Sequence, residues 1–311
     1  MRKCLSIGIN DYHSSPLTSC VGDAEGIATM LERNSDSTPN FHVRRLLAPP
    51  ESLTRSVLRE AISNLFDGND DITLLYFSGH GMFSGRGGYI VTTDFKRYDE
   101  GIAMDEILGI ANESKAKNKI IILDCCHSGA FGSPVLTGDS KALLSEGLTV
   151  LTASRPTESA YEGVFTPLLL QALEGGASDL LGNITPGAVY AFIDRALGAW
   201  DQRPIFKTNV TRFCSLRQVP PPIPLDILRN LTVYFPDPAV GFQLDPSYEF
   251  TDDSAVPEHI AILKELQRMV SVGLVVPVDE EHMYFAAMNS KSCRLTAFGN
   301  HYWHLANRGM L

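Results

Sequence analysis

The sequence predicts an α/β protein with a mostly parallel six-stranded sheet flanked by helices, followed by a small C-terminal α+β domain. Short runs of large apolar residues alternate with segments of helical periodicity, the pattern of a parallel sheet covered on both faces. Two of those runs end abruptly in small, polar and reactive residues, at 78–81 and 124–129, as buried strands do where they open into functional loops. Four prolines within 219–224 mark a boundary. We therefore expect one domain over 1–218 and a second over 219–311.

Six apolar runs have the length and bulk of buried strands. They are residues 3–9, 41–47, 71–77, 119–123, 148–152 and a last strand within 204–214. Five segments between them place apolar residues on one helical face, as Leu58, Ile62 and Leu65 do. These expected helices are 22–32, 51–66, 104–111, 164–173 and 186–197. Glycines near 85–88 predict a hairpin into 89–91, and the Gly-, Ser- and Pro-rich residues 130–146 predict a mobile surface loop.

The C-terminal segment has the outline of a winged-helix domain. Residues 257–272 predict an amphipathic helix, 274–278 and 282–288 a strand hairpin around an acidic turn, and 295–305 a final helix. Winged helices often bind DNA through a basic helix. From residue 222 onward, however, six Lys and Arg stand against eleven Asp and Glu, a balance of 6 − 11 = −5. We therefore expect no nucleic-acid partner.

Composition narrows the class of protein further. The chain has 311 residues and a formal net charge of −10, which disfavours non-specific binding to nucleic acid or anionic membranes. No run of 18 apolar residues and no signal peptide is visible, so we expect no membrane association. Six scattered cysteines do not form a disulfide framework. A reducing, cytoplasmic location follows as the expectation.

Cys126 and His80 are the candidate nucleophile and acid–base partner. A cysteine and a histidine at the carboxyl ends of neighbouring parallel strands can meet in space, and together they are the minimum for thiol catalysis. Cys125 competes for the role, but successive side chains on a strand alternate faces, so only one of the pair can face His80. His127 is a poorer base because adjacent residues on an extended chain diverge. The structural alternatives are an inert buried cysteine and a structural histidine.

Backbone N–H groups next to this pair can stabilise an oxyanion. His80 lies between two glycines, which leave room for an incoming carbonyl. The N–H groups of Gly81 and Cys126 are therefore the candidate oxyanion donors that acyl transfer requires.

The segments 78–81 (Ser-Gly-His-Gly) and 124–129 (Asp-Cys-Cys-His-Ser-Gly) resemble the two signatures of caspase-like cysteine peptidases. The resemblance is specifically to the metacaspase and paracaspase branch of peptidase family C14 in clan CD. The histidine lies 46 residues before Cys126, close to the separation expected for that fold. Three further segments are similar to the family in the same order: residues 5–24, 163–166 and 202–204. The resemblance covers roughly residues 3–215. It implies a caspase-like fold in which Cys126 attacks a peptide carbonyl and His80 protonates the leaving amine.

The resemblance also implies a substrate pocket. In metacaspases an acidic pocket receives Arg or Lys at P1, the residue before the cleaved bond, and the matching positions here are Cys20, Asp23, Ser78 and Asp124. Two carboxylates favour a cation and repel an acidic side chain, so we expect cleavage after Arg, with Lys second. The alternatives are a helix N-cap for Asp23 and a structural hydrogen bond for Asp124.

No metal or other cofactor is expected to be required, although calcium activation stays open. Some metacaspases bind Ca²⁺ through an acidic cluster, and Asp94, Asp99 and Glu100 lie in the corresponding region. In the loop that follows Cys126, Asp139 is the first acidic residue.

Regulation is expected to involve an activating small ligand or sensor protein, because we see no N-terminal prodomain. Prokaryotic relatives often act as switched effectors, including in antiviral defence. The aromatic-rich C-terminal segment predicts a small core, or else a regulatory surface with Arg268 or Arg294 as anion contacts. Lys141 and Arg155 are candidate self-cleavage sites. The competing function is a catalytically silent caspase-fold scaffold, and a winged-helix regulator is a third.

Overall fold

The protein divides into two compact units. The computed structural model describes residues 1–13, 15–49, 51–84, 87–96, 99–126, 143–154, 163–198 and 202–311. The first unit comprises residues 1–178 and 182–220, and the second comprises 179–181 and 221–311. The division after Pro220 falls inside the proline-rich segment 219–224.

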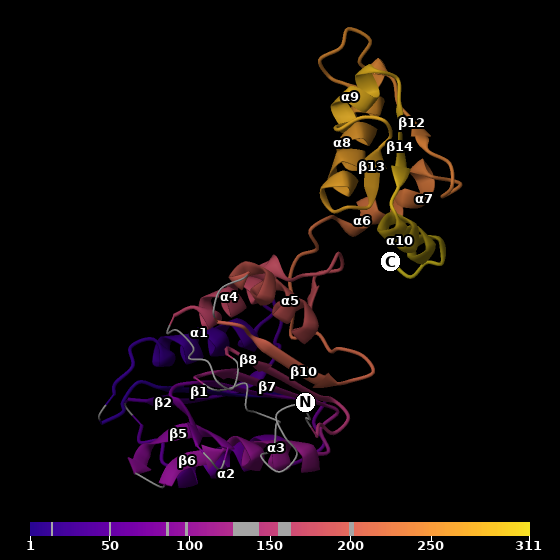
Figure 1. The fold of residues 1–311 in the computed structure, drawn as a ribbon. Coiled ribbons are helices and arrows are strands. Elements are labelled where there is room, and N and C mark those ends of the chain that lie inside the picture. Colours follow the sequence, from indigo (N-terminus) through magenta and orange to yellow (C-terminus); the bar gives the residue numbers. More distant parts are fainter. Residues whose placement is uncertain are drawn as a thin grey trace. The chain divides into compact units, whose positions relative to one another are not determined.

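A six-stranded sheet forms the centre of the first unit, which confirms the predicted architecture (Figure 1). Its spatial order is β10-β8-β7-β3-β1-β2, and β10 alone among these strands runs antiparallel to its neighbour. The strands are β1 (Arg2–Ile9), β2 (His42–Ala48), β3 (Ile72–Ser78), β7 (Asn118–Asp124), β8 (Leu148–Thr152) and β10 (Ile205–Asn209). The two strands that precede the candidate catalytic residues, β3 and β7, are direct neighbours.

Helices cover both faces of this sheet (Figure 1). On one face lie α2 (Arg55–Phe66) and α3 (Met104–Glu113), and on the other lie α1 (Cys20–Glu32), α4 (Phe165–Gln171) and α5 (Pro186–Leu197). A π-helical turn, Ala172–Gly176, extends α4. The predicted start of α2 at residue 51 is wrong by one turn, because Thr54 caps the helix by accepting a hydrogen bond from the N–H of Val57.

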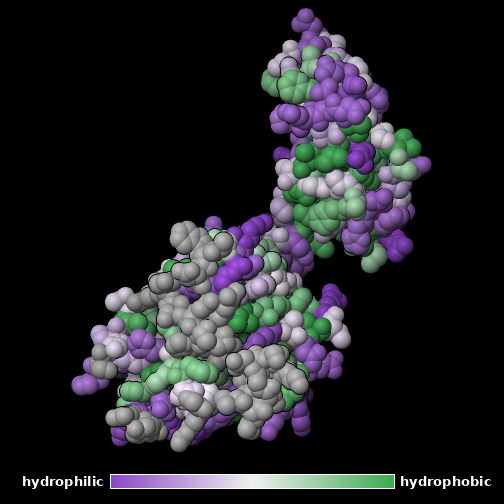
Figure 2. Space-filling view, viewed as in Figure 1, coloured by the Kyte–Doolittle hydropathy of each residue, from purple (hydrophilic) through white to green (hydrophobic). Residues whose placement is uncertain are grey.

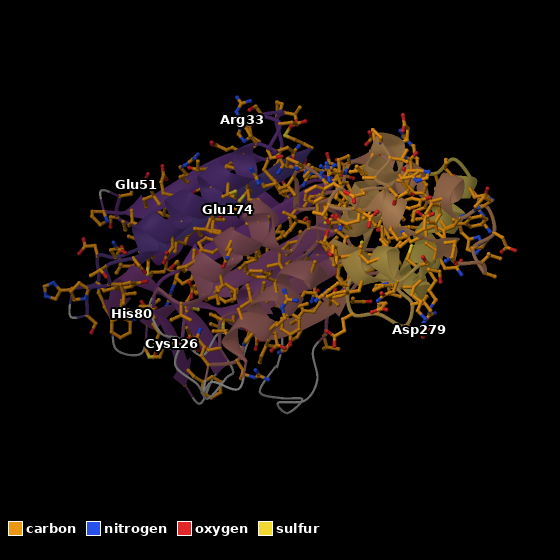
Figure 3. The ribbon with its side chains drawn as sticks, turned by 90° about the horizontal axis from the view of Figure 1, so that it is seen from above. Arg33, Glu51, His80, Cys126, Glu174 and Asp279 are labelled. Carbon is orange, nitrogen blue, oxygen red and sulfur yellow. The ribbon has the colours of Figure 1, made fainter. Side chains whose placement is uncertain are left out.

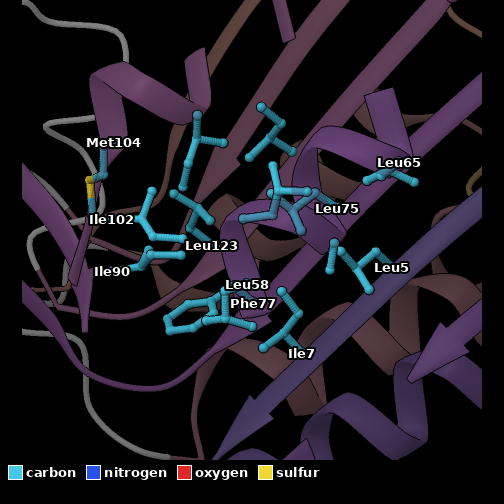
Figure 4. Close-up of a cluster of buried hydrophobic side chains, with 14 of the residues drawn as sticks. Leu5, Ile7, Leu58, Leu65, Leu75, Phe77, Ile90, Ile102, Met104 and Leu123 are labelled. Atoms are coloured by element: carbon cyan, nitrogen blue, oxygen red, sulfur yellow. The ribbon is translucent and has the colours of Figure 1, made fainter. Parts of the chain in front are cut away.

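Alternation along the strands divides the core into two layers. In β3, Leu75 and Phe77 pack with α2 and α3, whereas Leu74 and Tyr76 pack on the other side with α1 and α4. Figure 4 shows the first layer, in which Leu58 of α2 lies near Phe77. Because all four of these β3 side chains are fully buried, β3 is held rigidly up to its carboxyl end.

A small antiparallel sheet follows the candidate histidine directly. It contains β4 (Gly81–Ser84), β5 (Gly87–Lys96) and β6 (Asp99–Ala103) in that order. Ile90, Val91 and Ile102 of this sheet are buried and join the α2/α3 layer of the core, and Figure 4 labels Ile90 and Ile102. A two-stranded pair, β9 (Asn183–Ile184) and β11 (Arg217–Gln218), completes the unit.

The second unit is a small α+β domain with its own core. It contains α6 (Leu225–Arg229), α7 (Leu231–Tyr234), β12 (Phe242–Gln243), a 3₁₀ turn (Pro246–Tyr248), α8 (Pro257–Ser271), β13 (Val275–Pro277), α9 (Met283–Met288), β14 (Ser292–Leu295) and α10 (Ala297–Asn307). Its three strands form an antiparallel sheet in the order β12-β14-β13.

The predicted strand over 282–288 is wrong, because this segment forms helix α9 and the strand that returns beside β13 is β14. Met283, Ala286 and Ala287 are its buried side chains, and the spacing i, i+3, i+4 is that of one helical face. Alanine and methionine also favour helix over strand. A helix therefore interrupts the expected hairpin, and the winged-helix assignment stays a prediction.

The aromatic residues of the second unit are divided between core and surface. Phe235, Tyr248, Tyr302 and Trp303 are buried, and the indole N–H of Trp303 donates to the carbonyl of Phe235 over 2.7 Å. The exposed aromatic side chains are Phe250, Tyr284, Phe285 and Phe298. Figure 2 shows hydrophobic patches among hydrophilic residues on the visible face of this unit. Across the described ranges of both units, no helix has the length and hydrophobicity that spanning a membrane requires.

Candidate active site

The candidate site lies at the carboxyl ends of β3 and β7. Ser78 and Asp124, the last residues of these parallel strands, are partners in the register, and the N–H of Gly79 donates to the carbonyl of Asp124 over 3.3 Å. The segments that follow β3 and β7 then leave the same edge of the sheet, where α/β proteins bind ligands. His80 and Cys126 each lie two residues beyond these strand ends, and Figure 3 labels both.

One cavity of about 240 Å³ brings the predicted residues together. His80 and Cys126 line it, and so do all four residues of the predicted P1 pocket: Cys20, Asp23, Ser78 and Asp124. Leu17, Ser19 and Gly163 complete much of the wall. Segments separated by more than a hundred residues therefore form a single site with a thiol, an imidazole and two carboxylates.

The structure separates the two adjacent cysteines. Both line the cavity, but Cys125 continues the inward alternation of β7 and is buried in the α2/α3 layer, whereas Cys126 is half-buried. Burial raises the pKa of Cys125 well above its usual value, with a further contribution from the nearby Asp124. Cys125 is therefore held as the unreactive thiol, and Cys126 is the member of the pair that a substrate can reach.

A backbone carbonyl fixes the orientation of His80. Its Nε2 lies 2.7 Å from the carbonyl oxygen of Ser15. Because a carbonyl only accepts hydrogen bonds, Nε2 carries the proton in this contact, and Nδ1 is left as the nitrogen that can accept a proton. The imidazole is thus prepared to act as a base without an acidic side chain as its partner.

Tyr12 supports the same histidine from the loop after β1. Its ring centroid is 4.6 Å from that of His80, and its hydroxyl accepts from the N–H of His80 over 3.0 Å and donates to the carbonyl of Val91 over 3.3 Å. Burial raises the pKa of Tyr12, so the phenol keeps the proton that it donates. A Cβ on Gly79 would lie 2.5 Å from the Tyr12 hydroxyl, which explains the need for glycine before the histidine.

Gly81 lies directly against the backbone of the nucleophile. A Cβ at this position would lie 2.0 Å from the carbonyl oxygen of Cys126 and 3.0 Å from the sulfur of Cys125. Only glycine permits this approach. The two residues predicted to supply oxyanion donors are therefore neighbours in space.

Both carboxylates of the predicted P1 pocket also have hydrogen-bond partners. The hydroxyls of Ser19 and Ser78 donate to Oδ2 of Asp23 over 2.8 and 3.3 Å. The hydroxyl of Thr166, in α4, donates to Oδ2 of Asp124 over 2.6 Å. Asp124 thus has the structural hydrogen bond considered as an alternative, yet it also lines the cavity. The N-cap alternative for Asp23 is wrong, because α1 begins earlier, at Cys20, and Asp23 lies in its first turn.

Two of the acids considered for calcium already have partners within the chain. The carboxylate of Asp94 accepts from the backbone N–H of Arg55 over 3.0 Å, and Asp99 pairs with the guanidinium of the same arginine. A cation of the chain thus already satisfies Asp99. Within the described part of the chain, no group of three or more His, Cys, Asp or Glu side chains is placed to hold a metal. Asp139, His127 and the predicted self-cleavage residues Lys141 and Arg155 lie outside the described residues.

Sequence reasoning missed Tyr12, Thr166 and the carbonyl of Ser15. Tyr12 carries a weak signal, as an aromatic residue just after a buried strand. A main-chain carbonyl carries none, since every residue has one.

Comparisons with known proteins identify the class. The fold is that of the caspases: the chain is similar to caspase-1 of Spodoptera frugiperda, with a TM-score of 0.51 at 14% identity over 71% of this chain and 90% of that one. It is equally similar to the protein GSU0716 of Geobacter sulfurreducens, with a TM-score of 0.50 at 18% identity over 70% of this chain and 97% of that one. No curated protein matches the sequence.

The caspase domain model matches residues 1–212, more than half of the chain, and the protein therefore belongs to the caspase-domain family of cysteine peptidases. This match covers the whole central sheet and every described residue of the candidate site.

Proposed function

We propose that the protein is a cysteine endopeptidase that cleaves after Arg and, less efficiently, after Lys. The observation that carries this proposal is the single cavity lined by the Cys126 thiol, the His80 imidazole and two carboxylates. In the proposed reaction His80 takes the thiol proton through Nδ1, and the sulfur of Cys126 attacks the peptide carbonyl. The N–H groups of Gly81 and Cys126 stabilise the oxyanion. His80 then protonates the leaving amine and activates water to hydrolyse the thioester.

The preference for a cation follows from the charge of the cavity. Asp23 and Asp124 both line it, and none of its described lining residues is Lys or Arg. An Arg side chain can form charge-assisted hydrogen bonds with more than one carboxylate, whereas Lys presents a single point of charge. An acidic P1 side chain would be repelled.

Cleavage of a fluorogenic peptide panel tests the proposal. Substrates with Arg, Lys, Asp and Ala at P1 are compared with wild type and Cys126→Ala. We expect cleavage after Arg that is lost in the variant. Cleavage after Asp would contradict the assignment of Asp23 and Asp124.

The second candidate function is a catalytically silent scaffold, because the family match identifies the domain without establishing turnover. The oriented imidazole favours the peptidase, because a scaffold gains nothing from a histidine held with one nitrogen free for proton transfer. An electrophilic Arg peptide separates the two. Labelling of the wild type at Cys126, but not of Cys126→Ala, supports the peptidase, and absence of labelling supports the scaffold.

We further propose that the second unit regulates the first through a small ligand or a sensor protein. The support is that each unit has a separate core, and that the second exposes aromatic side chains together with Arg268 and Arg294. Deletion of residues 221–311 tests this. Neither core of the first unit contains a residue from that range. Unchanged activity and unchanged control in the truncated protein would contradict a regulatory role.

A further inference from the structure

A second cavity also borders His80. It has a volume of about 270 Å³ and shares His80 with the catalytic cavity, but none of the remaining catalytic-cavity residues lines it. Its walls come from the loop after β1 and from β4 and β5. His80 is thus the one described residue that lines both cavities.

The second cavity differs from the first in that neither of the two carboxylates lines it. Tyr12, Met82, Val91 and Phe95 supply apolar walls, and no Asp, Glu, Lys or Arg is among its described lining residues. The remaining walls are polar or backbone groups: His13, Ser15, His80, Gly81 and Thr93. Pockets that bind small groups are mostly apolar with a few polar atoms, which is the composition found here. An apolar side chain would bury surface against the four apolar walls, whereas a charged one would lose water and find no oppositely charged Asp, Glu, Lys or Arg among the described lining residues.

The order of the groups along a bound peptide indicates which substrate side chain would lie in the second cavity. The P1 side chain enters the acidic cavity, the thiol attacks the carbonyl that follows, and His80 protonates the amine that leaves. That amine belongs to P1′, the residue after the cleaved bond, so its side chain emerges near the imidazole, away from the P1 pocket. We propose that the second cavity binds the P1′ side chain and selects large apolar residues such as Leu or Phe. This inference rests on the proposed function and specifies its substrates further.

The walls of this cavity are held in place by the contacts that orient His80. The Tyr12 hydroxyl donates to the carbonyl of Val91, and the N–H of Val91 donates to the carbonyl of His80 over 2.9 Å. These bonds tie two walls of the cavity, Tyr12 and Val91, to the backbone of His80. Phe95, which is 42% exposed, lies at the solvent side of the same cavity. It can therefore be truncated without opening the core.

A matched pair of peptides measures the preference. Acetyl-Gly-Arg-Leu-Gly-amide and acetyl-Gly-Arg-Gly-Gly-amide differ only at P1′, and we expect wild type to cleave the first with a kcat/KM at least about tenfold higher. Phe95→Ala should reduce this ratio several-fold. Phe83→Ala is the control, because Phe83 lies on the same small sheet with 45% exposure but does not line the cavity. Equal cleavage of both peptides by wild type would overturn the inference.

Binding to the inactive variant Cys126→Ala separates this inference from the proposed function. Isothermal titration with the same peptides should show tighter binding of the Leu peptide, and the difference should shrink in Phe95→Ala/Cys126→Ala. Discrimination in binding without cleavage by wild type would preserve the cavity assignment and contradict the peptidase. Cleavage after Arg without discrimination at P1′ would support the peptidase and contradict the assignment of the second cavity to P1′. If neither peptide binds, or both bind equally, the cavity does not recognise P1′.

Discussion

Gly81→Ala tests how closely the small sheet must approach the nucleophile. The added methyl group would lie 2.0 Å from the carbonyl oxygen of Cys126, whereas real contacts of a Cβ are about 1 Å longer at least. Either β4 or the segment around Cys126 must therefore move by roughly 1 Å. A displacement of that size at reacting groups costs about 10²-fold in rate, and a lost oxyanion donor costs about 10²–10³-fold in kcat. We expect kcat to fall by about 10²-fold or more.

Steady-state kinetics on the Arg substrate, together with thermal unfolding, measures this effect. The forced contact should also lower the free energy of unfolding by about 1–3 kcal/mol, as overpacking does. Gly109→Ala is the matched control, because Gly109 lies in α3 with open space around its Cβ position. That variant should keep full activity and gain up to about 1 kcal/mol from helix propensity. Wild-type kcat in Gly81→Ala would refute both the close approach and its catalytic importance.

Three further results are expected. Asp23→Asn should lower kcat/KM for P1 Arg by about 10–100-fold, since a hydrogen bond to a charged group contributes ~1.5–3 kcal/mol, and should leave cleavage of the P1 Ala peptide unchanged. An equal loss for both peptides would argue against a P1 role. EDTA should leave activity unchanged, and a loss of activity that Ca²⁺ restores would contradict the expectation that no metal is required. Iodoacetamide at pH 8 should label Cys126 before Cys125, because burial raises the pKa of Cys125 and its thiolate therefore forms only at higher pH. Peptide mass mapping checks the order, and fast labelling that survives Cys126→Ala would contradict it.

The fold of the first unit was largely predictable because its strands are buried on both faces. The run 72–78 has five apolar residues among seven and is buried at every position, so its sequence is not that of a solvent-exposed element. Their order in the sheet was not predictable from composition. It depends on long-range pairings such as that of β3 with β7, which place residues 45 or more apart in register.

The second unit was harder to predict because its elements are short. Residues 282–288 contain apolar residues at spacings that suit either a strand or two turns of helix, and only the burial of Met283, Ala286 and Ala287 together selects the helix. Tertiary packing decides such ambiguous segments. The exposed Phe250 and Phe298 could not be separated from the buried Phe235 by residue type alone.

The residues of the candidate site that act through reactive side chains could be predicted from the sequence, whereas the backbone carbonyl that orients His80 could not. His80 and Cys126 could be recognised as reactive residues that follow apolar strands. The parallel pairing of β3 with β7 then brings both to the same edge of the sheet. The group that orients the histidine is the carbonyl of Ser15, which any residue could supply. The consequence is that substitution of the Ser15 side chain should leave this contact intact, whereas a change in the path of the backbone after β1 should break it. The identity of the loop residues therefore constrains the site less than the conformation of the loop does.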